Sequence, residues 1–420
     1  MRVLFVVFPS VSHLYPVVPL ARALWASGHE VCVASHAGIA EGDMSDAIRA
    51  TGLTAVPLGP REELHEAVAA HRRSAPGAAR EVLAFDPQGG GDWRTVRNVL
   101  LGMFDMYYPA RSEADGPWPM LDALVEFTRD WEPDLVLWDP LCPPAAVAAQ
   151  LNGVPHARVL WGLDSVGWIH GQQGPGDDRF AEWIRPHLKR YGLGFSSEQI
   201  LGQWSLDLVP FGTQLPFEGV SVPVRRVPYT GACTLPEWLH ARPERPRVVL
   251  SLGMSARRDP EGMSGLPLTE ILEKAAGRDF ELVATLDPAE LGSGVLPDNV
   301  RAAGYVPLDV LLPGASAVVH HGGGGTFAAA VAHRVPQIIV PVPKWDERVT
   351  GRYVQEHGAG IVLDRANLSV NELYLGIEQV VKDRAFSEGA RALRRQSLAL
   401  PGPLEAVALL ERLTQGRSRR

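Results

Sequence analysis

The sequence predicts an α/β protein built from two doubly wound parallel-sheet domains. Short apolar runs alternate with helical segments from the first residues onward, and the same alternation restarts in the second half of the chain. A proline-rich stretch without periodicity, residues 216–245, separates the halves and is typical of a linker. Strand, helix and strand in repetition indicate parallel strands with helices on both faces of the sheet. We therefore expect two such domains facing a central cleft.

The elements of the first half follow in order. Residues 3–9 (VLFVVFP) are a continuous apolar run, which suits a strand covered on both faces. After Pro16, apolar residues at helical spacing predict a helix that stops near residue 27: Val17, Leu20, Ala21 and Leu24. Further strands are predicted at 30–35, 53–59, 134–139 and 156–162. Residues 60–118 contain "PQGGGDW" and "SEADGPWP" and are predicted to be a loop-rich insertion that shapes a binding cleft.

The second half repeats this alternation. Its predicted strands are 247–254, 281–286, 300–307, 315–321 and 337–342. We expect an N-terminal domain at 1–215, the linker at 216–245, a C-terminal domain at 246–395, and a final helix at 396–420 that packs back on the N-terminal domain.

Composition excludes several classes of protein. The net charge of −8 argues against a general nucleic-acid binder, which needs a basic face. No apolar run approaches the roughly 18 residues of a membrane span. The N-terminal run has only Arg2 as a basic start, so we expect a buried strand and no signal peptide. Three distant cysteines form no metal-ligand spacing and favour a reducing, cytoplasmic location: Cys32, Cys142 and Cys233.

The most informative stretch is "ASAVVHHGGGGTF", residues 315–327, where two histidines run into four glycines. The strand should end at a carboxyl edge, where open α/β sheets bind ligands. A helix beginning near Gly325 and Thr326 would present free N–H groups and the positive end of its dipole to an anion. Glycines let the backbone approach phosphate oxygens, and His320 or His321 can donate a ring N–H. A glycine-rich turn without a ligand is the alternative.

Two familiar nucleotide motifs are missing. The first strand leads into "PSVSHLYP" and not into a spaced G-x-G-x-x-G, and no G-K-[ST] follows the glycines at 322–325. A diphosphate site without these motifs, late in the second domain, points to a nucleotide-linked group held for transfer.

Several motifs in the same order make the chain resemble the GT-B glycosyltransferases (family 1) that tailor antibiotics. They are "HHGGGGT", "RVPQIIVPV", "WDE", "WEPDLVLWDPL", "HARVLWG", "PDNVRAAGYVPLDVLLP" and "EHGAGIVL". The likeness runs nearly end to end. It is strongest to transferases that move deoxyhexoses or aminosugars from dTDP to macrolide or aromatic polyketide aglycones. The resemblance implies the GT-B fold, with two Rossmann-like domains. It also implies an N-terminal domain for the acceptor and a C-terminal domain for the donor.

The resemblance also implies the donor site. Its diphosphate contacts fall on His321, Gly323, Gly324, Gly325 and Thr326, with Gly253 and Ser255 on the facing loop. The nucleobase falls on Tyr305, Val306 and Pro307. The acidic pair that reads sugar hydroxyls falls on Asp346 and Glu347. Many relatives carry glutamine at the second place, so Glu347 hints at a basic aminosugar. A helix N-terminal acidic pair is the alternative for these two residues.

The general base of the family falls on His13, just past the first predicted strand. A neutral imidazole can take a hydroxyl proton as the new bond forms, best when a carboxylate holds its other nitrogen. Asp139, at the end of "DLVLWD", is our candidate for that carboxylate. A loop histidine in solvent is the alternative for His13.

No D-x-D motif is present to hold a divalent cation, so the helix end and His321 should stabilise the leaving diphosphate. The resemblance implies a metal-independent transfer with inversion at the anomeric carbon, and no cofactor beyond the dTDP-sugar donor.

A bulky apolar acceptor needs aromatic walls, which the predicted pocket segments 60–118 and 161–205 could supply through Trp93, Trp161 and Trp168. Core filling is the alternative for these tryptophans. Relatives with "WDP", "VLWG" and "GQWSLD" often need a catalytically inactive cytochrome-P450-like helper. The resemblance therefore implies a possible helper of this kind here, an inference that Arg22, where many of those relatives carry tryptophan, weakens. The sequence is compatible with a homodimer but does not decide it, nor does it name the sugar, the aglycone or the glycosylated atom.

Two rival functions remain open. A nucleotide-sugar 2-epimerase shares the two-domain shape, but it has no need of an apolar acceptor pocket. A catalytically silent homologue acting as a binding partner would not require His13, Asp139 and an intact "HHGGGGT".

Overall fold

The computed structural model describes residues 1–36, 43–59, 92–109, 118–174, 176–209, 213–253, 266–286, 295–342 and 345–418. The chain divides into two compact units, one of Met1–Arg226 with Leu400–Arg420 and the other of Val227–Ala399. The division after Arg226 falls inside the stretch that the sequence marks as a linker.

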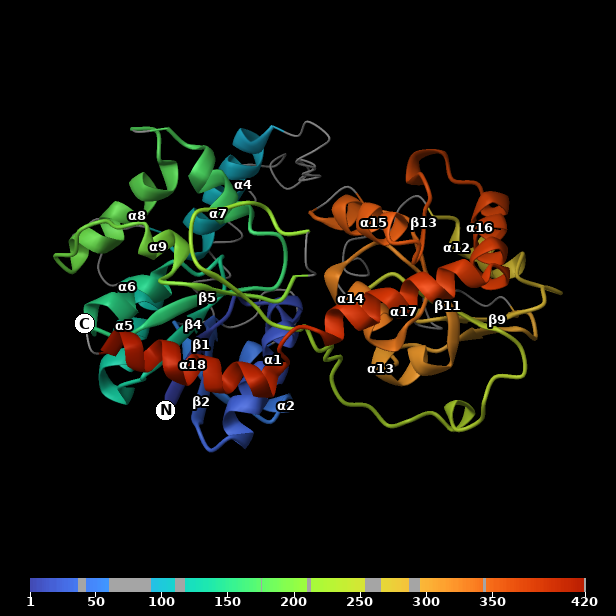
Figure 1. Ribbon diagram of the computed structural model, residues 1–420, viewed down its shortest axis with the longest axis horizontal. Coiled ribbons are helices and arrows are strands. Elements are labelled where there is room, and N and C mark those ends of the chain that lie inside the picture. Colours follow the sequence, from blue (N-terminus) through green and yellow to red (C-terminus); the bar gives the residue numbers. More distant parts are fainter. Residues whose placement is uncertain are drawn as a thin grey trace. The chain divides into compact units, whose positions relative to one another are not determined.

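The first unit is built on a seven-stranded sheet in the order β3-β2-β1-β4-β5-β6-β7 (Figure 1). All neighbouring strands in it are parallel. The strands are β1 (Arg2–Val6), β2 (Glu30–His36), β3 (Thr54–Leu58), β4 (Leu135–Trp138), β5 (His156–Leu160), β6 (Ser205–Asp207) and β7 (Ser221–Pro223). The strand order reverses between β1 and β4, which makes the carboxyl ends of this pair the topological switch point of the sheet.

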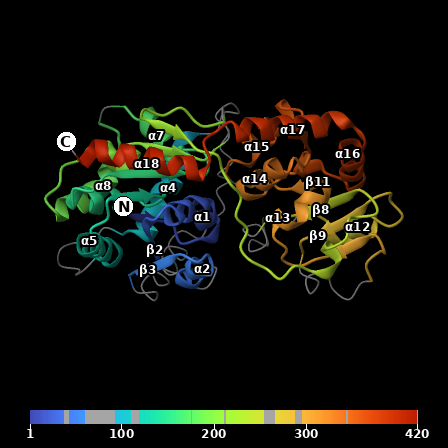
Figure 2. The same cartoon turned by 60° about the horizontal axis from the view of Figure 1, so that its bottom comes forward.

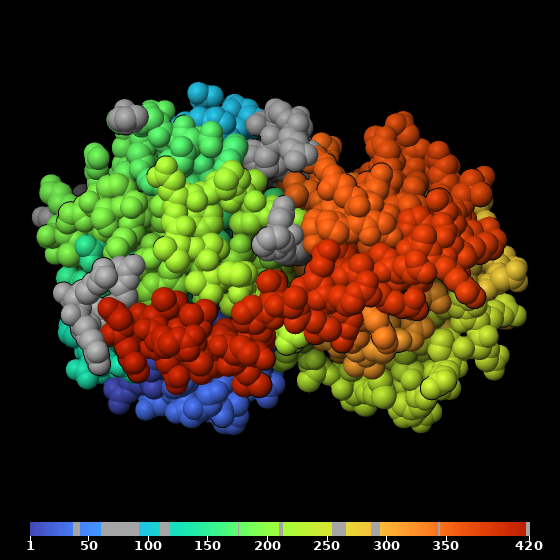
Figure 3. Space-filling model, viewed as in Figure 1, coloured from blue at the N-terminus to red at the C-terminus, as the bar shows by residue number. Residues whose placement is uncertain are grey.

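Helices surround this sheet. They are α1 (Val11–Ala26), α2 (Met44–Ala50), α4 (Trp93–Tyr107), α5 (Pro119–Trp131), α6 (Pro144–Leu151), α7 (Ser165–Gln172), α8 (Arg179–Arg190), α9 (Glu198–Leu201) and α18 (Pro403–Ser418). Although α18 ends the chain, it packs against α1 in this unit. Its Glu411 carboxylate lies 3.1 Å from His29 Nε2. Figure 3 shows this last helix, in red, lying across the surface of the unit.

The central strands are buried on both faces, as their apolar runs predict. Val3, Leu4, Phe5 and Val6 of β1 are fully buried, and so is Trp138 at the end of β4. Burying one such aliphatic or aromatic side chain stabilises a fold by about 1.5–3 kcal/mol. This packing holds the two strand ends at the switch point in fixed register, with Val6 opposite Trp138.

The first helix begins earlier than its periodicity predicts. It starts at Val11, so Pro16 lies inside the helix and does not open it. Ser10 is extended and caps the helix by accepting a hydrogen bond from the Ser12 N–H. Pro16 cannot donate to the carbonyl of Ser12, but the cost is offset by the apolar residues that this helix buries. The earlier start places His13 in the first turn.

Two other segments also differ from the prediction. Residues 93–107, inside the expected loop-rich insertion, form α4, because Val96, Leu100 and Phe104 recur every four residues and are buried. Residues 60–91 and 110–117 of that insertion lie outside the described residues. Within the expected linker, β7 pairs with β6 and extends the first sheet beyond residue 215. A strand of three residues is too short to show a periodicity.

The second unit has a six-stranded parallel sheet in the order β10-β9-β8-β11-β12-β13 (Figure 2). Its strands are β8 (Arg247–Ser251), β9 (Glu281–Ala284), β10 (Val300–Ala302), β11 (Ala315–His320), β12 (Gln337–Ile339) and β13 (Gly360–Val362). Its α-helices are α12 (Leu268–Glu273), α13 (Leu308–Leu311), α14 (Gly324–His333), α15 (Glu347–Glu356), α16 (Val370–Lys382) and α17 (Arg384–Leu398), with 3-10 turns at η3 (Glu237–Leu239), η5 (Leu312–Gly314) and η6 (Arg365–Asn367). Here the order reverses between β8 and β11.

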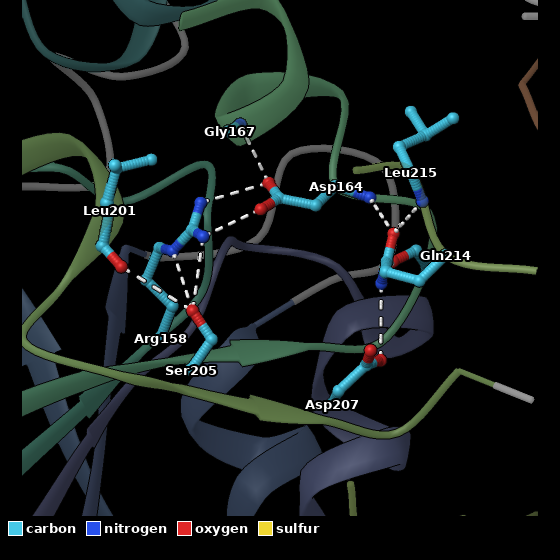
Figure 4. A network of polar contacts seen from close by, with 9 residues as sticks. Arg158, Asp164, Gly167, Leu201, Ser205, Asp207, Gln214 and Leu215 are labelled. Atoms are coloured by element: carbon cyan, nitrogen blue, oxygen red, sulfur yellow. Dashed lines mark hydrogen bonds and ion pairs between the residues drawn. The ribbon is translucent and has the colours of Figure 1, made fainter. Parts of the chain in front are cut away.

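A buried ion pair links β5 to the start of α7 in the first unit. Arg158 and Asp164 have fully buried side chains and form two hydrogen bonds, of 2.9 and 2.6 Å. Asp164 also caps α7 by accepting the Gly167 N–H, and a Cβ at Gly167 would lie 2.2 Å from its Oδ2. Figure 4 shows the wider network, in which Ser205 holds the guanidinium and Gln214 joins Asp164 to Asp207.

Replacing Asp164 with asparagine should destabilise the protein strongly, because it leaves the Arg158 charge buried without its counter-charge. Breaking a buried pair in this way costs about 3–5 kcal/mol. Urea denaturation of Asp164→Asn measures the loss. The control is Asp130→Asn, which removes an exposed partner of Arg129 and should leave the unfolding midpoint unchanged. Equal midpoints for the two variants would contradict a structural role for the buried pair.

Candidate active site

The first candidate site lies at the switch point of the first sheet. His13 lies in the first turn of α1, the helix that follows β1, and Asp139 comes directly after β4. The Asp139 N–H donates to the carbonyl of Val6 at 2.9 Å, which ties the end of β4 to the end of β1. The two side chains, separated by 126 residues in sequence, thereby meet: His13 Nδ1 lies 2.7 Å from Asp139 Oδ2.

The environment of Asp139 determines the tautomer of His13. Both residues are buried, His13 with 8% and Asp139 with 3% of its surface exposed. A carboxylate can only accept, so Nδ1 carries a proton, and in the neutral imidazole Nε2 is the nitrogen with the lone pair. The main-chain N–H of Leu141 donates to Oδ1 at 2.8 Å, and the Trp161 indole N–H donates to Oδ2 at 2.8 Å. The arrangement can therefore act as an oriented general base.

Two other titratable groups lie close to Asp139. Tyr108 donates its hydroxyl to Cys142 Sγ at 3.0 Å. Burial raises the pKa of both groups well above their ordinary values, and the charge of Asp139 raises the pKa of each further. Both groups are therefore neutral near pH 7 and do not compete with His13 for the proton of an acceptor.

The second candidate site lies at the switch point of the second sheet. His320 ends β11 opposite Ser251 of β8. Its imidazole is buried and accepts the Gly322 N–H at Nδ1, while Nε2 donates to Gln337 Oε1 at 3.0 Å. Burial lowers the pKa of His320 to about 3, so it stays neutral. Both ring nitrogens of His320 are thus used in hydrogen bonds that hold the glycine turn to β11 and β12.

His321 is the histidine that packs against the glycines. A Cβ at Gly253 would lie 2.5 Å from its Cε1, and a Cβ at Gly323 would lie 2.4 Å from its Nε2. Neither position can take a side chain unless the imidazole moves. Gly253 has φ +71° and Gly322 has φ +99°, which also favour glycine. These glycines hold the ring of His321 beside the start of α14.

The helix start itself is suited to an anion. α14 begins at Gly324 with Gly323 as N-cap, which has no side chain to satisfy the first N–H groups. The N–H groups of the first turn of a helix have no partner within the helix, and its dipole is positive there. Gly324, Gly325 and Thr326 thus offer main-chain donors next to His321. A carboxylate or phosphate fits this position.

The other predicted donor residues are placed as follows. Val306 is buried in the core, Pro307 is the N-cap of α13, and the half-exposed Tyr305 donates its hydroxyl to the carbonyl of Thr230. Asp346 is the N-cap of α15, and Glu347 is its first residue, with a buried carboxylate that accepts the Trp345 N–H at 2.6 Å. Ser255 lies outside the described residues.

The three tryptophans predicted to line the acceptor pocket lie in different surroundings. Trp93, at the start of α4, and Trp168, in α7, both pack on the main core of the first unit. Trp161 instead contacts the candidate dyad. Sequence reasoning missed this contact and the Gln337 bond to His320. A polar residue opening the apolar run "QIIVPV" was a usable signal for Gln337, whereas nothing in the sequence pairs Trp161 with Asp139.

The described residues contain no cluster of three or more His, Cys, Asp or Glu side chains placed to hold a metal ion. No helix in the described part of the chain is long and apolar enough to cross a membrane.

Comparison with known proteins gives the family. Residues 22–253 match the N-terminal domain, and residues 269–413 the C-terminal domain, of the erythromycin biosynthesis protein CIII-like model. The chain belongs to the erythromycin biosynthesis protein CIII-like family. One relative in this family, aclacinomycin-T 2-deoxy-L-fucose transferase of Streptomyces galilaeus, is 38% identical over 99% of this chain and 96% of its own. Another, the 3-alpha-mycarosylerythronolide B desosaminyl transferase of Saccharopolyspora erythraea, is 38% identical over 99% of both chains.

Solved structures agree. Glycosyltransferase VinC in complex with dTDP superposes with a TM-score of 0.83 at 34% identity, over 99% of this chain and 100% of that one. The spinosyn forosaminyltransferase SpnP gives a TM-score of 0.78 at 31% identity, over 99% of both. These matches confirm the predicted GT-B fold and show that this member of the erythromycin biosynthesis protein CIII-like family is a glycosyltransferase. They lend no support to an epimerase or to a silent homologue.

The contact of His321 with Gly323 makes a testable prediction about stability. Gly323→Ala should lower the free energy of unfolding, because the new Cβ displaces the imidazole. Gly325→Ala is the matched control in the same turn, since a Cβ there meets nothing within 4 Å. It should be neutral or stabilise by about 0.5 kcal/mol. Chemical denaturation compares them, and a Gly323→Ala variant as stable as the control would refute the packing argument.

Proposed function

We propose that this glycosyltransferase moves a deoxysugar, in some cases an aminosugar, from a dTDP-sugar to a hydrophobic polyketide-type aglycone in antibiotic biosynthesis. Relatives of similar length are named for transfer to mycarosylerythronolide B, to 10-deoxymethynolide and to aklavinone. Desosaminyl, mycaminosyl and rhodosaminyl transferases among them support an aminosugar. Glu347 hints at the same, with one carboxylate oxygen already accepting the Trp345 N–H. The hydrogen bond between His13 Nδ1 and Asp139 Oδ2 is the observation on which the proposal chiefly depends.

The proposed step is a single displacement. His13 Nε2 takes the proton of the acceptor as the acceptor atom bonds to the anomeric carbon, and Asp139 stabilises the imidazolium that forms. The bond from that carbon to the diphosphate oxygen breaks, and dTDP departs with the electron pair. Attack from the face opposite the diphosphate inverts the anomeric centre.

The leaving dTDP needs its growing charge stabilised. We assign this to the first N–H groups of α14 and to His321, whose position the glycines fix. On this proposal no metal ion takes part, because these donors meet the diphosphate themselves. Tyr305, Val306 and Pro307 for the thymine, and Asp346 and Glu347 for the sugar, remain predictions from the resemblance.

The remaining assignments concern partners and location. α4 and α7, which carry Trp93 and Trp168, are our candidates for the aglycone site. A cytochrome-P450-like helper and a homodimer stay predictions from the sequence. A cytoplasmic location is in keeping with three free cysteines.

Removing the imidazole of His13 should abolish transfer while donor binding survives. With a dTDP-6-deoxyhexose as donor and 10-deoxymethynolide or aklavinone as probe acceptor, His13→Ala should lose at least about 100-fold in kcat. Its affinity for dTDP should stay within about twofold, because the anion site lies in the other unit.

The matched control is His29→Ala. This variant also removes an imidazole paired with a carboxylate, but at the amino end of β2, away from the carboxyl ends of the strands where the candidate site lies. Its kcat should match that of the wild type. Transfer by His13→Ala within a few-fold of the wild type would exclude His13 as the base.

A further inference from the structure

Trp161 contacts both members of the candidate dyad. Its indole N–H donates to Asp139 Oδ2 at 2.8 Å, the same oxygen that accepts from His13. Its ring also lies edge-on to the imidazole of His13, with centroids 4.0 Å apart and an interplanar angle of 61°. Trp161, which the sequence predicts to line the acceptor pocket, thus contacts both residues of the candidate base.

These contacts fix the carboxylate of Asp139 in one orientation. Oδ1 accepts the main-chain N–H of Leu141, and Oδ2 accepts from His13 and Trp161. Without the indole, the carboxylate could turn about its last bond and lose alignment with Nδ1. A hydrogen bond to a charged group is worth about 1.5–3 kcal/mol. Trp161 can therefore decide how well the base is aligned, although it has no group that takes a proton.

The segment that carries Trp161 is itself held rigidly. The main-chain carbonyl of Trp161 accepts a hydrogen bond from Arg226 Nη1 at 2.7 Å. Three residues later, Asp164 enters the buried pair with Arg158, and its main-chain N–H donates to Gln214 (Figure 4). Residues 161–164 therefore bridge between β5 and α7 with both ends anchored. A side chain that only lines an apolar wall does not need its main chain to be anchored in this way.

We propose that Trp161 is a positioning residue of this transferase: its indole N–H, presented by the anchored segment 161–164, aligns Asp139 and through it His13. The inference rests on the proposed role of His13 as base. It assigns Trp161 to the reaction step, where the sequence had assigned it to acceptor binding.

The test is a double-mutant cycle between Trp161 and Asp139. Trp161→Phe keeps an aromatic ring but removes the N–H. In the wild-type background it should lower kcat about tenfold, with the KM for the dTDP-6-deoxyhexose unchanged. In the Asp139→Ala background the same change should cost less than about twofold, because no side-chain oxygen is left at position 139 to accept the indole N–H. An equal loss in both backgrounds would overturn the proposal.

The release of dTDP without an acceptor gives a second readout. If Trp161 aligns the base, Trp161→Phe should slow the hydrolysis of the donor by water to the same degree as transfer. If Trp161 only lined the acceptor pocket, the variant would raise the KM for the aglycone and leave hydrolysis intact, which contradicts the proposal.

Matched controls separate the proposal from a folding defect. Trp183→Phe removes a similar indole bond, to Asp105 at 2.8 Å, and should keep the wild-type kcat. Placing benzothienylalanine at position 161 keeps the shape of the ring and replaces only the N–H by sulfur. This variant should reproduce the tenfold loss, and wild-type kcat from it would refute the inference. A His13→Ala variant that still turns over would instead exclude His13 as the base, whatever the Trp161 variants show.

Discussion

The reversal of strand order in each sheet is the constraint on which both candidate sites depend. Between β1 and β4, and again between β8 and β11, neighbouring strands end side by side while the chain continues outward on either side. Side chains that follow such strands meet, although they are far apart in sequence. His13 and Asp139 come together in this way in the first unit, and Gly253 and His321 in the second.

The two units use the same position for different chemistry. In the first, the strand ends are packed with side chains, and a carboxylate orients an imidazole in a buried setting. In the second, the strand end is followed by glycines, so main-chain N–H groups at the start of α14 are the main hydrogen-bond donors. The missing side chains also leave space for the imidazole of His321. A buried, oriented base suits proton removal, whereas bare backbone at a helix start suits an anion. On the proposed function, the first unit would receive the acceptor and the second the leaving diphosphate.

Much of this could be predicted from sequence, because continuous apolar runs mark buried parallel strands and the residues after them mark the carboxyl edge. Asp139 and the glycine turn were found in that way, whereas the resemblance to the GT-B glycosyltransferases singled out His13 just past the first strand. Local patterns failed where tertiary packing overrides them. Pro16 looked like a helix start, but the buried face of α1 carries the helix through it. Alternation along a strand could not decide between His320 and His321, because the choice depends on Gln337 in a neighbouring strand.

Trp161 shows a different limit of sequence reasoning. Its residue type suggested an apolar wall, and no periodicity links it to Asp139, 22 residues earlier. The contact exists because β4 and β5 are neighbours and the buried pair of Arg158 and Asp164 fixes the segment after β5. Such a role follows only once the sheet order and a buried polar network are known.

A crystal structure of the protein with dTDP tests the central claim most directly. The account predicts that the diphosphate lies at the start of α14, with its oxygens within hydrogen-bond distance of the His321 ring and of the first main-chain N–H groups of that helix. A diphosphate bound at any other strand end, with the glycine turn empty, would contradict it.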